Sequence, residues 1–125
     1  MPIIDANIIL RYLIGDHPEM SAEAREIILS GAQTTAEVLA EVVYVLKGVY
    51  HVERADIGET VGNFLQEISV PHKAAIAYAC KLYSEKSLDF VDCILAGFHY
   101  IEGADVLTFD ERLKKAINNP PAFND

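Results

Sequence analysis

Pro2-Ile3-Ile4-Asp5-Ala6-Asn7 opens the chain and decides how the remainder is arranged. The apolar run before Asp5 is too short for a helix and predicts a buried strand that ends at this aspartate. The following apolar residues, Ile8 to Ile14, predict a helix that Gly15 closes. In an open α/β sheet, ligands bind where a strand ends and a helix begins. Two interpretations of Asp5 stay open, a cap of this helix or a carboxylate of a binding site.

The length and composition predict one compact domain. The chain has 125 residues, of which 51% are hydrophobic, enough for a single buried core. We expect this domain to cover residues 1–117. Residues 118–125 begin with Asn118-Asn119-Pro120-Pro121, which cannot continue a helix, so they predict a C-terminal surface tail.

The charge balance argues against a protein that holds nucleic acid mainly by neutralising phosphates. Asp and Glu number 19 against 10 Lys and Arg, which gives a formal net charge of −9. The excess acids either lie on solvated helix faces or converge on a divalent cation, whose charge would offset their repulsion. The net charge alone does not choose between these alternatives.

The cysteines and the apolar runs bear on compartment. Cys80 and Cys93 lie inside apolar helical patterns without paired spacing, so we interpret them as small buried hydrophobes of a reducing cytoplasm. No apolar run approaches the roughly 18 residues of a membrane span, and no basic segment precedes an apolar run at the start. We therefore expect a soluble, unprocessed, cytoplasmic protein with no membrane partner.

The periodicity of the sequence predicts an α/β fold of three layers, α/β/α, with a central, mostly parallel sheet of short strands. Apolar residues at helical spacing predict helices over residues 21–30, 36–49, 53–68, 72–85, 88–102 and 111–117. Short extended runs predict further strands over residues 32–34, 69–71 and 104–109.

Three more acids occupy unusual positions. Glu41 and Asp92 each lie in the middle of a strongly apolar helix, where a semi-buried carboxylate is costly unless it is paired or bound to metal. Asp110 ends the predicted strand 104–109 as Asp5 ends the first strand, and it too has a capping alternative. Glu37, one turn before Glu41, is interpreted as an exposed first-turn acid.

Together, Asp5, Glu41, Asp92 and Asp110 predict a hard-metal site at one end of the sheet. Oxygen ligands select Mg²⁺ or Mn²⁺, and several carboxylates with open water positions suit the activation of water against a phosphodiester. Each acid alone has a structural explanation, but the four together favour a site.

The chain resembles the PIN-domain ribonucleases, and most closely the VapC-type toxins of prokaryotic toxin–antitoxin pairs. The resemblance covers nearly the whole length and depends on the order and spacing of four strings. These are Ile4-Asp5-Ala6-Asn7, Leu39-Ala40-Glu41-Val42-Val43-Tyr44-Val45-Leu46, Asp89-Phe90-Val91-Asp92-Cys93-Ile94-Leu95-Ala96 and Leu107-Thr108-Phe109-Asp110.

This resemblance implies roles and partners. It implies that Asp5, Glu41, Asp92 and Asp110 hold Mg²⁺ or Mn²⁺ and serve catalysis, and that Asn7 and Thr108 support the site, with Asp89 as an outer helper. It also implies a homodimer, a cognate antitoxin that blocks the groove, and single-stranded or looped RNA as substrate.

A nuclease also needs positive charge for the RNA backbone. The candidates near the predicted site are Arg11, Lys47 and Arg54. Arg11 lies one turn after Asn7, and two interpretations have equal weight: it contacts RNA, or it forms an ion pair that neutralises the acids.

Two rival functions stay open, a PIN-like binding module without catalysis and another Mg²⁺-dependent phosphodiesterase or DNA nuclease. A nucleophilic-aspartate phosphatase is disfavoured because Asn7 stands where a second aspartate would be needed. The scattered histidines His17, His51, His72 and His99 predict neither a zinc site nor a Ser–His–Asp enzyme.

Overall fold

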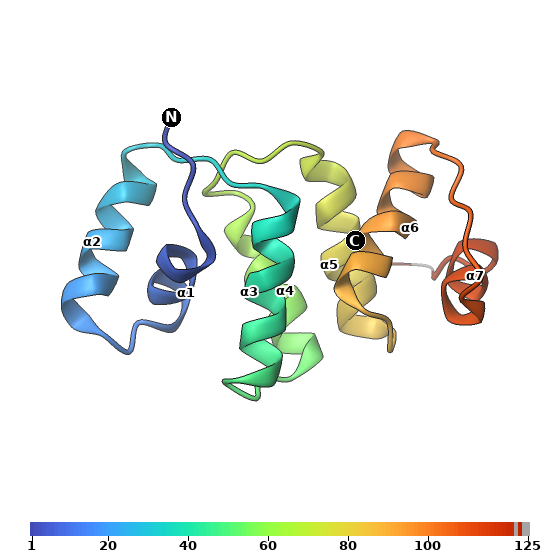
Figure 1. Ribbon diagram of the computed structural model, residues 1–125, viewed down its shortest axis with the longest axis horizontal. Helices are drawn as coiled ribbons and strands as arrows, with labels where there is room; N and C mark the ends of the chain where they lie inside the picture. The colour runs from blue at the N-terminus through green and yellow to red at the C-terminus, as the bar shows by residue number, and fades with distance from the viewer. Residues whose placement is uncertain (122, 124–125) are drawn as a thin grey trace.

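The computed structural model describes residues 1–121 and 123. The helices of the described part are α1 (Ala6–Ile14), α2 (Pro18–Leu29), α3 (Ala36–Gly48), α4 (Arg54–Phe64), α5 (Lys73–Glu85), α6 (Phe90–Glu102) and α7 (Glu111–Asn118). Figure 1 shows these helices spread along the long axis of the molecule, with α2 outside α1 at one end and α7 at the other. No helix among the described residues is long and apolar enough to span a membrane.

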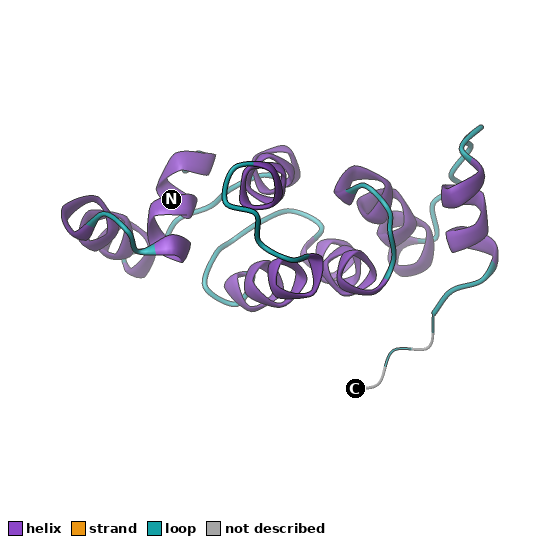
Figure 2. Cartoon of the chain, turned by 90° about the horizontal axis from the view of Figure 1, so that it is seen from below, coloured by secondary structure: helices purple, strands orange, loops and turns teal. Residues whose placement is uncertain are grey.

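The predicted central sheet is wrong. In the described residues the extended segments meet only at two isolated parallel bridges, Ile3 with Gln33 and Gln33 with Ser69. Figure 2 accordingly shows helices and loops. Each contact is short: the Ile4 amide donates to the Gln33 carbonyl at 2.9 Å, and the Thr34 amide donates to the Ser69 carbonyl at 2.9 Å. Segments this short close single bridges and cannot propagate a ladder.

The predicted strand 104–109 is also wrong. The segment follows α6, pairs with no other extended segment in the described chain, and leaves Leu107 96% exposed and Phe109 99% exposed. Val106 and Thr108, which alternate with them, are half-buried. The apolar run was interpreted as buried, but without a neighbouring strand only one of its two faces is covered.

Most predicted helices are confirmed, with shifts at their ends. Gly15 and Gly103 end α1 and α6 in left-handed conformations, at φ 68° and 72°, and Thr35 caps α3 through its side chain. The second helix begins earlier than Ser21, because Pro18 fits its first turn and the His17 ring accepts from the Met20 amide. The fourth ends at Phe64 instead of Ile68.

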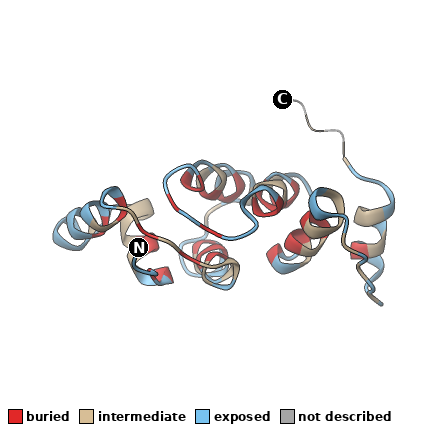
Figure 3. Ribbon diagram, turned by 90° about the horizontal axis from the view of Figure 1, so that it is seen from above, coloured by how far each residue is buried: buried red, intermediate tan, exposed pale blue. Residues whose placement is uncertain are grey.

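The core lies between these helices, as the buried faces in Figure 3 show. It includes Ile9, Leu39, Ile57, Phe64 and Leu82, none more than 1% exposed. The helices α4, α5 and α6 pack closely in sequence order. A Cβ on Gly58 would lie 2.5 Å from the Cys80 carbonyl oxygen, so only glycine allows α4 this close to α5. A Cβ on Gly62 would lie 3.6 Å from the Cβ of Cys80, an ordinary van der Waals contact.

Two sequence expectations concern details of this packing. Cys80 and Cys93 are free and buried, as expected, and burial raises the pKa of each thiol to about 12. In the predicted tail, Phe123 packs edge-on against Tyr78 with ring centroids 5.3 Å apart. Residues 122, 124 and 125 of that tail lie outside the described residues.

Arg54, the first residue of α4, ties α4 to the loop between α5 and α6. Its Nε donates to the Tyr83 carbonyl at 3.1 Å, and its Nη2 donates to the carbonyls of Lys86, at 2.7 Å, and Leu88. The guanidinium carbon also lies 3.8 Å from the centroid of the Tyr83 ring. One cation thus satisfies three carbonyls at the end of α5 and in the loop, which have no helical partner there.

We expect Arg54→Ala to lower the free energy of unfolding by about 2–4 kcal/mol, because it removes charge-assisted hydrogen bonds and a cation–π contact. Arg54→Lys keeps the charge but not the planar fork, so it should recover only part of this loss. Urea denaturation of the three proteins measures the effect. The exposed Arg25→Ala on α2 is the matched control and should change stability by less than about 0.5 kcal/mol. Equal stability of Arg54→Ala and Arg25→Ala would contradict the assignment.

Candidate functional site

Asp92, in the first turn of α6, is the carboxylate most affected by its surroundings. It is half-buried, and its pKa is raised first by loss of solvent and then by the negative charges of Asp110 and Asp89. The structure therefore brings Asp89, Asp92 and Asp110 together from the start of α6 and the start of α7. Of the four principal acids that the sequence predicted at one site, only Asp92 and Asp110 interact in this way.

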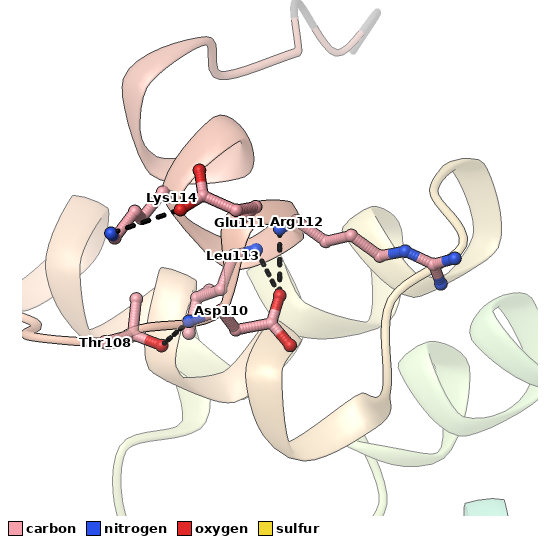
Figure 4. A network of polar contacts seen from close by, with 6 residues as sticks. All are labelled: Thr108, Asp110, Glu111, Arg112, Leu113 and Lys114. Atoms are coloured by element: carbon pink, nitrogen blue, oxygen red, sulfur yellow. Dashed lines mark hydrogen bonds and ion pairs between the residues drawn. The ribbon is translucent and has the colours of Figure 1, made fainter.

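Asp110 caps α7. Its Oδ1 accepts from the Arg112 amide at 2.8 Å and from the Leu113 amide at 3.1 Å, and the Thr108 hydroxyl accepts from the Asp110 amide at 3.0 Å (Figure 4). The capping alternative thus holds, and Thr108 supports Asp110 by fixing its backbone. Within the described chain the second oxygen, Oδ2, accepts no hydrogen bond, so capping leaves it available to a ligand.

Asp5 caps α1 in the same way. Its Oδ1 accepts from the Ile8 amide at 3.1 Å, and the side chain is exposed. No three of the four principal acids lie close enough in the described chain to share one ion, so the structure does not gather Asp5 and Glu41 with Asp92 and Asp110 into one site.

Glu41 is exposed, which corrects the expectation of a semi-buried acid. The buried residues of α3, Leu39, Val42, Val43 and Leu46, form one stripe. Glu41 lies outside that stripe, on the side of Tyr44, which is 80% exposed. The unbroken apolar run suggested burial all around, but the 3.6-residue period leaves this position facing solvent.

The supporting residues are distributed over both ends of the molecule. Asp89 occupies the capping position of α6, as predicted, but its side chain makes no capping bond. Asn7 lies exposed beside Arg11 at a small cavity of about 150 Å³. Arg11 pairs with Asp16, Nη1 to Oδ1 at 3.4 Å, and not with any of the four acids.

A groove separates α3 from α6 and ends at the acids. A cavity of about 510 Å³ is lined by Tyr44 and Lys47 of α3 and by Asp89 and Asp92 of the opposite wall. A second cavity, of about 480 Å³, continues between the same helices and shares Ala40 and Val91 with the first. Its wall is mainly apolar and includes Ile94, Leu95 and Phe98.

Sequence reasoning missed the role of Arg54, which it grouped with the cations available to RNA. The structure commits this guanidinium to backbone carbonyls next to Asp89. The signal in the sequence was weak, since an arginine at the start of a helix has no specific pattern. Its partners, three carbonyls about 30 residues later, cannot be identified before the fold is known.

The described residues do not form a complete metal site. No group of three or more His, Cys, Asp or Glu side chains among them lies close enough to share one ion. The donor chemistry fits Mg²⁺ or Mn²⁺, because Asp92 and Asp110 offer hard oxygens and their mutual repulsion favours a cation. The positions of Asp5 and Glu41 do not fit a four-carboxylate site in this arrangement.

We expect Asp92→Asn to stabilise the protein at neutral pH in chelator. The raised pKa means that the native state binds more protons than the unfolded state above the ordinary pKa of 3.8, so stability falls as pH rises through the raised value. The melting temperature of the variant should therefore exceed that of the wild type by a gap that widens as the pH rises from 3.8 through the raised pKa and levels off above it. Melting curves across pH in EDTA measure the gap.

The exposed Asp105→Asn, in the segment before Asp110, is the control and should show no such gap. If Asp92→Asn and the wild type kept the same difference at every pH, the charge of Asp92 would not be the source of the strain.

Comparison with known proteins gives a consistent assignment. The PIN domain model matches residues 3–118. A VapC ribonuclease from Aquifex aeolicus (strain VF5) is 31% identical over 123 residues, which cover 92% of this chain and 91% of the relative. No solved structure matches the chain significantly. The family match over most of the length and the similarity to this relative show that the chain belongs to the PIN-domain family and is of the VapC type.

Proposed function

We propose that the protein is a Mg²⁺- or Mn²⁺-dependent endoribonuclease that cleaves single-stranded or looped RNA, and that it is the toxin of a toxin–antitoxin pair. The observation that carries the proposal is the desolvated carboxylate Asp92 beside Asp110 and Asp89 in a chain of the PIN family. The similarity to a VapC ribonuclease supports RNA as the substrate.

In this proposal Asp92 and Asp110 are the first donors to a cation, and Asp5 and Glu41 complete the set. A divalent cation would supply activation of water at neutral pH and would offset the charge of the scissile phosphate. The free Oδ2 atoms of Asp5 and Asp110 fit this role, since capping uses Oδ1 in both. No three of these acids lie close enough in the described chain to share one ion, so a cation held by all four would require α1 and α3 to move toward α6.

The proposal includes a cognate antitoxin and a homodimer, which the family supports. The groove between α3 and α6 suits an apolar segment of the antitoxin, because its walls are mainly apolar and it ends at Asp89 and Asp92. A basic side chain at the end of that segment would form charge-assisted hydrogen bonds with these carboxylates. A complex in which the antitoxin leaves the groove empty would contradict this part of the proposal.

The purified protein should cleave single-stranded RNA in MgCl₂ or MnCl₂ and stop in EDTA. Cleavage by Asp92→Asn and by Glu41→Gln should fall by at least about 100-fold, because each removes a donor. Gel analysis of end-labelled RNA measures the rates. Glu59→Gln, an exposed acid on α4, is the matched control for Glu41→Gln and should retain the wild-type rate.

The outcomes separate the rival functions. Cleavage that continues unchanged in EDTA would exclude a metal-dependent enzyme, and tight RNA binding without cleavage would favour a binding module. Preferential cleavage of DNA would favour another phosphodiesterase. If Glu41→Gln alone kept full activity, Glu41 would not be a ligand of the cation, and it would be an ordinary exposed acid of α3.

A further inference from the structure

A third large cavity, of about 490 Å³, lies between the α5–α6 loop and α7, apart from the groove described above. The loop contributes Lys86, Ser87 and Leu88, and the other wall is formed by Arg112, Lys115 and Asn119 from α7 and its C-terminal end. Three of the ten basic side chains of the protein thus line one cavity, and no carboxylate lines it. In a chain of net charge −9, this concentration of cations is unexpected.

These three cations are unpaired within the described part of the chain. No Asp or Glu there forms an ion pair with Lys86, Arg112 or Lys115. The neighbouring Lys114 differs, since its Nζ lies 3.3 Å from Oε1 of Glu111. Figure 4 shows the Arg112 side chain extending away from both Asp110 and Glu111. Within the described chain the positive charge therefore faces the cavity and solvent without an ion pair to a carboxylate.

The cavity and the acids belong to the same two segments. Leu88 lines the cavity and directly precedes Asp89, and Arg112 follows Asp110 by two residues. Arg54 fixes this geometry, because it holds the carbonyls of both Lys86 and Leu88. An RNA strand that passes over the Asp92 cluster would meet these cations on continuing past the loop.

We propose that this cavity binds the sugar–phosphate backbone of RNA next to the phosphate that is cleaved. The inference rests on the proposed function and adds the surface that holds the substrate. Ammonium and guanidinium groups offer donors and no acceptor, and Ser87 and Asn119 add neutral donors, a set that suits phosphate oxygens. The cavity lacks an aromatic side chain for base stacking, so it recognises the backbone and not the sequence.

The test compares two double variants that change the net charge equally. Arg112→Gln with Lys115→Gln removes two cations from the cavity. Arg25→Gln with Lys73→Gln removes two exposed cations from α2 and α5. Binding of a fluorescent single-stranded oligoribonucleotide is measured by anisotropy over a series of KCl concentrations in EDTA, so that the readout does not depend on cleavage.

The cavity variant should bind about tenfold more weakly, and the slope of log affinity against log salt should fall by about 1.4, or about 0.7 for each lost phosphate contact. The control variant should bind within about twofold of the wild type and keep its slope. Arg112→Lys with Lys115→Arg keeps both charges and should restore binding, and melting curves verify that each variant is folded.

Equal weakening by both double variants would overturn the inference, because only the net charge would then matter. Unchanged RNA binding by the cavity variant would overturn it too. If that variant kept its affinity for RNA but lost affinity for polyglutamate, the cavity would bind an acidic peptide and not RNA. If the protein binds RNA through the cavity but never cleaves it with Mg²⁺ or Mn²⁺, the proposed function fails while this inference stands. If the protein cleaves RNA and the cavity variant keeps its affinity and salt slope, the proposed function stands while this inference fails.

Discussion

The hydrogen bonds of Arg54 to three carbonyls hold the loop that leads into the proposed site. The loop between α5 and α6 has no regular structure of its own, and its carbonyls cannot be satisfied by a helix. Arg54 satisfies those of Lys86 and Leu88, with Tyr83 as a third acceptor and as the ring beneath the guanidinium. A planar group with five donors does this with one side chain, which a lysine cannot. The loop is therefore held next to α6 with the start of that helix, and Asp92, in a defined place.

The same loop divides charges of opposite sign. On one side are Asp89 and Asp92, which with Asp110 form the acidic cluster, and on the other Lys86 faces a cavity with Arg112 and Lys115. A metal-dependent nuclease needs both, a concentrated negative charge to hold the cation and a positive surface for the substrate. Side chains of opposite charge that lie this near in the chain could form ion pairs with each other, and neither set would then be available to a ligand. Because Arg54 of α4 holds the loop by its backbone carbonyls, the loop side chains are not needed to hold it in place.

The sequence was informative where structure is local. Periodicity predicted most of the helices, and the caps Thr35, Asp5 and Asp110 depend only on residues within three positions. It failed where a feature depends on a distant partner. The strand 104–109 was predicted from apolar residues alone, yet a strand exists only if another strand lies beside it, and none does in the described chain. The same holds for Arg54, whose partners are set by how α4 packs on α5.

The candidate site shows the same division. The sequence singled out Asp92 and Asp110, because an acid inside an apolar helix and an acid before a helix are visible there, and the charge of Asp110 does raise the pKa of Asp92. Glu41 was placed in the wrong environment, since an apolar run hides which side of a helix faces solvent until its neighbours are known. The basic cavity was missed because its members are separated by more than 20 positions, from Lys86 to Arg112, and only the fold joins them.

The net charge of −9 argues against a protein that holds nucleic acid mainly by neutralising phosphates, and the structure limits the reach of that argument. At physiological salt the charges of a protein surface act over about 8 Å, so distant acids add little to the potential that a bound phosphate experiences. What counts is the local set, and within the cavity that set is three cations and no carboxylate. The excess acids elsewhere still oppose a second, non-specific RNA contact. A protein built in this way would hold RNA at one place beside its acids and weakly everywhere else, which a uniformly basic surface could not achieve.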